Sequence, residues 1–143
     1  MVFCDTSTLA KYYVQEADSA AVRSRLDAED SVWCSELGRA ELMSVFHRQF
    51  REKKMDRAAF LTLVRQFQND DVGGHWTWVP IDHSIFEQVT KTYATLPDTV
   101  FLRTADCIHL VTALYSGFSE IYTHDAVQSR AANALGLRTI TIS

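Results

Sequence analysis

The feature that most constrains this chain is an alternation of short apolar runs with longer segments whose apolar residues recur at helical spacing. Short apolar runs bounded by polar residues predict buried strands, and apolar positions three or four residues apart predict amphipathic helices. Strands that alternate with helices pair in parallel, because the chain must cross over between them. The strands lack polar alternation, as expected when both faces of a sheet are covered. The sequence therefore predicts a three-layer α/β/α sandwich with a central parallel sheet.

The expected elements follow one another without a linker or a repeat, so we expect a single domain over residues 1–143. Thr104 is placed to cap the sixth helix, and Gly136 is placed to follow the last one. The candidate strands cover residues 2–4, 31–34, 76–81, 121–123 and 139–142, and the helical patterns cover residues 9–14, 20–26, 37–54, 56–67, 85–96, 105–115 and 126–135.

Charge and cysteine content narrow the possible functions. The chain has 14 Lys and Arg against 18 Asp and Glu, a net charge of -4. This balance argues against a protein that holds nucleic acid by bulk positive charge, although it leaves room for a local basic groove. Three cysteines without a C-x-x-C pair predict neither a disulfide framework nor a thiolate zinc site. With no signal-peptide pattern and no apolar run of membrane-spanning length, we expect a cytoplasmic protein with no membrane contact.

Two acids occupy the places where parallel α/β sheets carry their functional groups. Asp5 directly follows the first strand, and Asp125 follows the fourth strand after one intervening residue. The carboxyl ends of parallel strands form the usual ligand-binding edge, and helix amide groups there favour an anion. Asp5 and Asp125 are therefore candidate site residues.

Two further acids lie in helical segments among apolar neighbours. Glu41 follows Ala40, and Asp106 lies between Ala105 and Cys107. Each has a simpler interpretation: Asp106 can complement a helix dipole in the first turn, and Glu41 can lie on a solvated helix face. Carboxylates gathered in one cleft repel one another unless a cation neutralises them. Mg²⁺ or Mn²⁺ would suit such a set, and either ion can activate water for phosphodiester hydrolysis.

Each of the four acids lies in a short segment that is informative as a whole. The four segments are Val2-Phe3-Cys4-Asp5-Thr6-Ser7, Ser35-Glu36-Leu37-Gly38-Arg39-Ala40-Glu41-Leu42, Leu102-Arg103-Thr104-Ala105-Asp106-Cys107-Ile108-His109-Leu110 and Thr123-His124-Asp125. These segments resemble those of PIN-domain nucleases, and of VapC-type toxins in particular. The resemblance covers essentially the whole chain in the same order, and the third segment, with the pattern R-x-x-D-x-x-H-L, is the most specific.

This resemblance implies a metal-dependent endoribonuclease that acts as the toxin of a type II toxin–antitoxin pair. It implies RNA as substrate, a cognate antitoxin that covers the active site, and a homodimer. Ser7 and Thr123 match hydroxyl positions that orient the acids or bound water. The acidic quartet of catalytic residues and metal ligands is carried over to Asp5, Glu41, Asp106 and Asp125.

Among the basic residues, Arg39 and Arg103 lie within three residues of an acid of the quartet and are the candidate RNA contacts. Further basic residues that can supply phosphate contacts are Lys11, Arg48, Arg51, Lys53 and Lys54, although for residues 51–54 a solvated helix end is the preferred interpretation. His109 lies one helical turn after Asp106, and we expect it to form hydrogen bonds near the site rather than bind metal. Trp76 and Trp78 share strand parity and would be able to stack on unpaired RNA bases, but core packing or a dimer surface is the preferred interpretation.

Three alternatives are weighed against a nuclease. The first is a non-catalytic α/β module that binds a protein partner, with the acids as solvated polar groups. The second is a dehalogenase-type phosphatase, which needs a second acid two residues after Asp5, where Ser7 stands. The third is a Rossmann domain, which needs a glycine-rich turn after the first strand, yet no glycine precedes Gly38.

Overall fold

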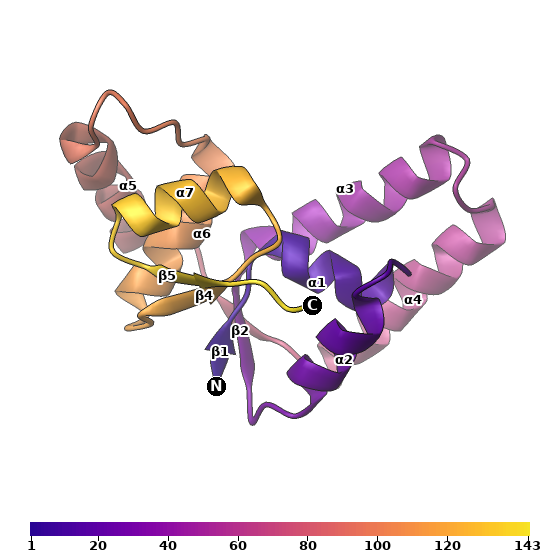
Figure 1. Cartoon of the computed structure of the whole chain (residues 1–143). Coiled ribbons are helices and arrows are strands. Elements are labelled where there is room, and N and C mark those ends of the chain that lie inside the picture. Colours follow the sequence, from indigo (N-terminus) through magenta and orange to yellow (C-terminus); the bar gives the residue numbers. More distant parts are fainter.

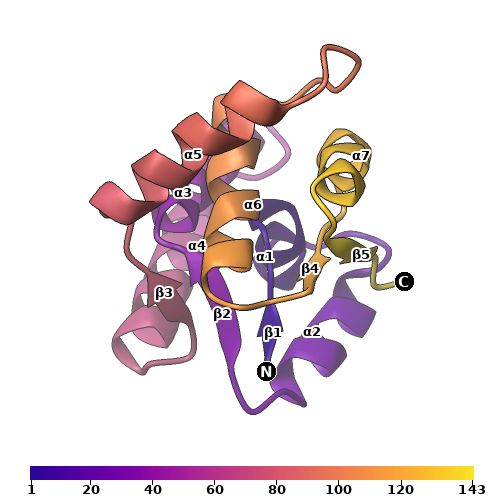
Figure 2. The same ribbon diagram turned by 90° about the vertical axis from the view of Figure 1, so that its left-hand side faces the viewer.

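Five short strands lie side by side at the centre of the molecule, in a computed structural model that describes residues 1–143. Hydrogen bonds join β1, β2 and β3 in parallel, and they join β4 and β5 in the same way. A parallel bridge between Cys4 and Tyr122 links the two groups, so the strand order is β3-β2-β1-β4-β5 (Figure 2). The strands are β1 (Val2–Phe3), β2 (Val32–Ser35), β3 (Thr77–Val79), β4 (Glu120–Tyr122) and β5 (Arg138–Ile140).

Seven helices cover the two faces of these strands, with α1 to α4 on one side and α5 to α7 on the other (Figure 1). Helices α3 and α4 form a pair that projects from the body of the molecule (Figure 1). The helices are α1 (Thr6–Tyr13), α2 (Ser19–Asp27), α3 (Leu37–Arg51), α4 (Arg57–Val72), α5 (His83–Thr95), α6 (Thr104–Tyr115) and α7 (Ala126–Ala134).

Each face of the sheet has its own hydrophobic core, because successive side chains of a strand point to opposite faces. Cys4 and Tyr122 pack toward α1 to α4, where Phe46 of α3 is fully buried. Phe3 and Ile121, one position earlier in each strand, pack toward the other helices. The predicted α/β/α sandwich with a parallel sheet is therefore confirmed.

Several element bounds differ from the sequence expectations, since α4 extends to Val72 and β3 covers only Thr77–Val79, and the cap of α6 differs as well. Thr104 is the first residue of α6 and not its cap, because the preceding Arg103 is extended and no side chain caps this helix. Gly136 takes a left-handed conformation with φ 82° after α7, as expected of a residue that ends a helix. Trp76 and Trp78 pack within the core on the α1 side, with Trp76 buried and Trp78 half-buried. None of the seven helices has both the length and the apolar character needed to cross a membrane.

The strand order determines where a site can form. From the central strand β1, the chain adds β2 and β3 on one side and later returns to add β4 and β5 on the other. At such a switch point the loops after neighbouring strands diverge and leave a crevice at their carboxyl ends. The loops that diverge here begin at Asp5 and Thr123.

Candidate active site

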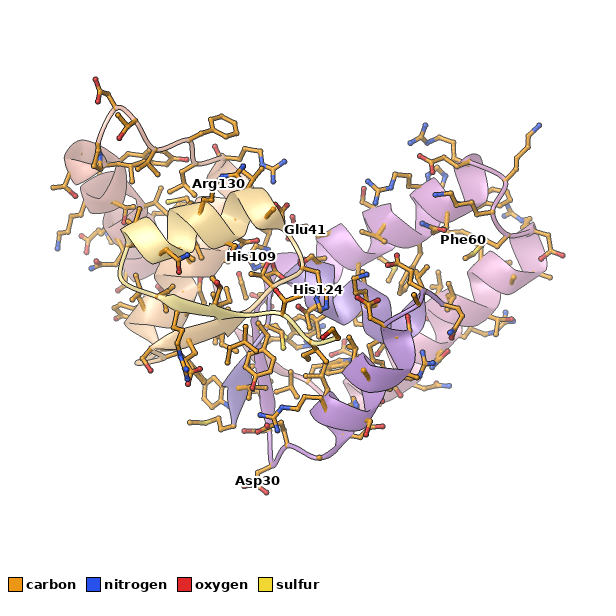
Figure 3. All side chains as sticks on the ribbon, in the orientation of Figure 1. Asp30, Glu41, Phe60, His109, His124 and Arg130 are labelled. Carbon is orange, nitrogen blue, oxygen red and sulfur yellow. The ribbon has the colours of Figure 1, made fainter.

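The four predicted acids line one cleft at the carboxyl ends of β1 and β4. The cleft has a volume of about 520 Å³ and is bounded by α1, α3, α6 and the first turn of α7. Glu41 on α3 and His109 on α6 come from opposite sides of it, and His124 lies nearby in the loop before α7 (Figure 3). The topology thus brings together acids that are up to 120 residues apart in the chain, Asp5 and Asp125 being the farthest.

Asp5 lies deepest of the four, with only 1% of its surface exposed. Its Oδ1 accepts hydrogen bonds from the Ser7 hydroxyl at 2.7 Å and from the Thr8 amide at 3.1 Å, which makes Asp5 the N-cap of α1. Its Oδ2 accepts one from the Thr123 hydroxyl at 2.5 Å. Burial raises the pKa of Asp5 above its ordinary value, although these three donors oppose the rise.

Ser7 and Thr123 connect the acids to the backbone. The Ser7 hydroxyl accepts a hydrogen bond from the His124 amide at 2.8 Å while it donates to Asp5. The Thr123 hydroxyl accepts from the Asp125 amide at 3.1 Å while it also donates to Asp5. Each hydroxyl therefore fixes Asp5 against the loop after β4, which is the arrangement expected of groups that orient an acid.

Glu41 is held by a hydrogen-bonded cluster that joins three helices. The Thr6 hydroxyl of α1 donates to its Oε1 at 2.7 Å, and Nε2 of the buried His109 on α6 contacts the same oxygen. Burial tends to raise the pKa of Glu41, but the hydrogen bond and charge of His109 outweigh it, so the pKa lies below its usual value. His109 makes the hydrogen bond near the site that its sequence position suggested.

Arg103 binds the remaining two acids at once. Its Nε donates to Asp106 at 2.7 Å, and its Nη2 donates to Asp125 at 2.9 Å. Asp125 also caps α7 by accepting from the amides of Val127 at 2.8 Å and Gln128 at 3.1 Å. Burial raises the pKa of Asp125, yet these amides and Arg103 outweigh it and hold the pKa below its usual value.

Arg39, the other predicted RNA contact, does not line the cleft. Its guanidinium lies over the Trp78 ring at 5.1 Å and donates to Asp71 of α4 at 2.8 Å. The reason is helical geometry, since residues two apart point to different sides of a helix, whereas Arg103 and Asp106 are three apart and meet. Arg48 lies seven residues, or two helical turns, after Glu41 and therefore on the same side of α3, and it does line the cleft.

Thr6 is a further site residue that was not predicted from the sequence.

The donor set fits a divalent cation in its chemistry. All four acids offer oxygen ligands, as Mg²⁺ and Mn²⁺ require, and the buried Asp5 carboxylate is contacted by no Lys or Arg. Asp106, Asp125 and Glu41 are instead bonded to Arg103 or His109. The donor atoms therefore suit such an ion in kind, but in this arrangement no three His, Cys, Asp or Glu side chains are grouped as a metal site.

The sequence matches the PIN domain family over residues 2–134, which is nearly the whole chain. The chain belongs to this family. The fold, the order of the acids and their shared cleft agree with the resemblance stated from the sequence, which is thereby confirmed. No curated protein matches this PIN domain in sequence.

Several solved structures share this fold. The toxin VapC20 of Mycobacterium tuberculosis, which cleaves the sarcin–ricin loop, has 15% identity and a TM-score of 0.70, with 92% of this chain and 95% of that chain covered. FitAcB of Neisseria gonorrhoeae has 17% identity and a TM-score of 0.70, with 98% and 96% covered. VapBC2 of Rickettsia felis, bound to a promoter DNA fragment, has 9% identity and a TM-score of 0.68, with both chains fully covered.

Proposed function

We propose that this PIN domain is an endoribonuclease that hydrolyses RNA phosphodiester bonds with the help of Mg²⁺ or Mn²⁺. The observation that carries the proposal is the convergence of Asp5, Glu41, Asp106 and Asp125 on one cleft at the switch point of the sheet. A divalent ion, when bound, polarises a phosphoryl oxygen and lowers the pKa of the attacking water. Asp5 and Asp106 are the proposed direct ligands, with Glu41 and Asp125 as ligands through water or to a second ion.

The protein's own side chains contribute position and charge. Ser7 and Thr123 hold Asp5 in one orientation, and Thr6 and His109 do the same for Glu41. Carboxylates fixed in this way lose little freedom when a cation binds, which favours binding. Arg103, which is half exposed and lies at the mouth of the cleft, can pair with a phosphate of the RNA.

Replacing the proposed ligands provides the first test. We expect Asp5→Asn and Asp106→Asn to lower the rate of RNA cleavage by ~10³ or more, which corresponds to about 4 kcal/mol of lost transition-state stabilisation. Cleavage is measured on total cellular RNA, and sequencing of the RNA ends identifies the cleaved bond. Asp98→Asn, which removes an exposed carboxylate outside the cleft, is the matched control and retains the wild-type rate. Near-normal metal-dependent cleavage by both ligand variants contradicts the assignment of these acids, whereas absence of cleavage by the wild-type protein favours a non-catalytic binding module.

We further propose that the chain is the toxin of a type II pair, forms a homodimer and is neutralised by a cognate antitoxin. The support is its fold, which it shares with VapC20 and with the chains of the VapBC2 and FitAcB structures. Expression of the chain alone should arrest growth, and co-expression of the partner encoded beside it should restore growth. Light scattering measures the mass of the purified protein, and a mass of one chain contradicts the homodimer.

A further inference from the structure

The cleft does not end at the acids but continues along one face of α3. Ser44, Val45, Arg48 and Gln49 line it together with Glu41. These five positions follow the spacing of three and four residues that defines a single stripe on a helix. The buried residues of α3, such as Leu42 and Phe46, form the neighbouring stripe and pack into the core, and the half-buried Val45 packs against the same core. The α3 stripe, defined here as residues 41, 44, 45, 48 and 49, is therefore fixed in place and open to solvent.

Charge pairing distinguishes Arg48 from the other basic residues of the cleft. Three Lys or Arg side chains line the cleft, namely Lys11, Arg48 and Arg103. Lys11 is bound to Glu16 and Asp18, and Arg103 is bound to Asp106 and Asp125. Arg48 is exposed and has no carboxylate or other hydrogen-bonding partner for its guanidinium. Because the Arg48 guanidinium is not paired, unlike the charged groups of Lys11 and Arg103, it is available to an anion that enters the cleft.

We propose that the α3 stripe is a binding track for the RNA backbone and that Arg48 binds a phosphate next to the one that reacts. This inference rests on the proposed function, because a strand with one phosphodiester at the acids must lay its neighbouring phosphates along the cleft. Arg48 lies roughly 10 Å along the helix axis from Glu41, at 1.5 Å per residue. Its planar guanidinium suits a phosphate, and Ser44 and Gln49 add neutral donors of the kind that position nucleic-acid backbones.

The test compares two arginines that differ in whether they line the cleft. Arg65 lies in the middle of α4, is exposed, forms no ion pair and does not line the cleft, so Arg65→Gln is the control for Arg48→Gln. Both variants are made with Asp5→Asn to prevent cleavage. Their binding to a fluorescein-labelled single-stranded RNA that spans the wild-type cleavage site is then measured by anisotropy over a range of KCl concentrations.

We expect Arg48→Gln to weaken RNA binding about tenfold, the effect of one lost charge-assisted contact. We also expect the slope of log K against log [KCl] to become shallower by about 0.7, the value for one phosphate contact on a single strand. Arg48→Lys should keep the slope, since it keeps the charge. In the active enzyme Arg48→Gln should raise KM and change kcat by less than about twofold. A contact remote from the reacting bond stabilises the bound substrate and the transition state equally, so its loss weakens binding without slowing the chemical step.

Equal RNA affinities and equal salt slopes for Arg48→Gln and Arg65→Gln overturn the inference while leaving the nuclease assignment intact. If Arg48→Gln instead weakens only the binding of an acidic protein partner, the stripe is a protein-binding surface and the RNA track is wrong. Absence of RNA cleavage by the wild-type protein is a different result, since it removes the proposed function itself. The melting temperatures of the two exposed-site variants show whether both remain folded.

Discussion

At the bottom of the cleft, the carboxylate of Asp5 is almost fully shielded from solvent, and only uncharged groups donate hydrogen bonds to it. A buried anion without a cationic partner is unfavourable, and its cost appears as a raised pKa. The hydroxyls of Ser7 and Thr123 reduce this cost without removing it. A cation bound beside Asp5 would therefore stabilise its buried carboxylate.

This imbalance predicts that Asp5→Asn makes the metal-free protein more stable at pH 7, although we expect the same substitution to lower the rate of RNA cleavage. An acid whose folded pKa is raised contributes most to stability below its unfolded pKa, and that contribution is lost as the pH rises through the folded value. The neutral amide avoids this loss, and the Thr123 hydroxyl can rotate to accept a hydrogen bond from it. Thermal denaturation in EDTA at pH 7 and at pH 4 measures the effect.

The gain in melting temperature should be larger at pH 7 than at pH 4, where the wild-type carboxyl is itself closer to neutral. Ser7→Ala provides a contrast, because it removes a donor from the buried anion and should lower the melting temperature at pH 7. A melting temperature for Asp5→Asn below that of the wild type at pH 7 contradicts the argument.

At the scale of elements, α3 shows how much of the site the sequence could predict. Its length and its apolar stripe were predictable from periodicity, and so was the presence of Glu41 in it. The direction of each basic side chain depends on angular position and on neighbouring helices, which is why Arg39 turns to Asp71 on α4. The cluster of Thr6, Glu41 and His109 joins three helices and was not predictable, because nothing local indicates which helices meet.

The packing of α3 against β3 and α1 predicts that Gly38→Ala destabilises the protein. A methyl group at this position would lie 3.2 Å from Cζ3 of Trp78 and 3.6 Å from the Thr6 hydroxyl oxygen. The indole cannot move easily, because Phe67 and Arg39 pack on it and its Nε1 donates to Asp71. Overpacking costs about 1–3 kcal/mol and exceeds the gain of up to about 1 kcal/mol in helix propensity.

Urea denaturation is the appropriate measurement, and we expect a net loss of about 1 kcal/mol in the free energy of unfolding. Trp78→Phe removes the ring atom that the methyl group approaches. In that background Gly38→Ala should therefore cost less, which appears as a coupling energy in the double-mutant cycle. An equal cost in both backgrounds shows that another neighbour resists the methyl group.

At the scale of the whole molecule, topology makes a site out of residues with separate local roles. Asp5 caps α1, Asp125 caps α7, and Asp106 lies in the first turn of α6, so each satisfies a simple structural rule in its own helix. The strand order β3-β2-β1-β4-β5 then brings the three together with Glu41. The fold class followed from the alternation of elements, whereas the pairing of Arg103 with two acids required the three-dimensional arrangement.

Net charge is also best understood at this scale. The chain carries 18 acids and 14 bases, and five of the acids line the cleft, four of which are the proposed metal ligands. Without those four, the remaining acids and bases balance, so the overall charge of -4 says little about affinity for RNA. A bound cation together with Arg48 and Arg103 would provide the local attraction for RNA.

A divalent ion should therefore stabilise the folded protein as a whole. An ion that binds only the folded state at a concentration of 100 times its Kd adds about 2.7 kcal/mol, which raises the melting temperature by roughly 5–10 °C for a chain of this size. Differential scanning calorimetry with MnCl₂ measures the rise, with Asp98→Asn as a control that retains it. The double variant Asp5→Asn/Asp106→Asn should lose most of the rise, because it removes both proposed direct ligands. An equal rise in the double variant means that Mn²⁺ binds elsewhere, and no rise in the wild type removes the cation from the proposed reaction.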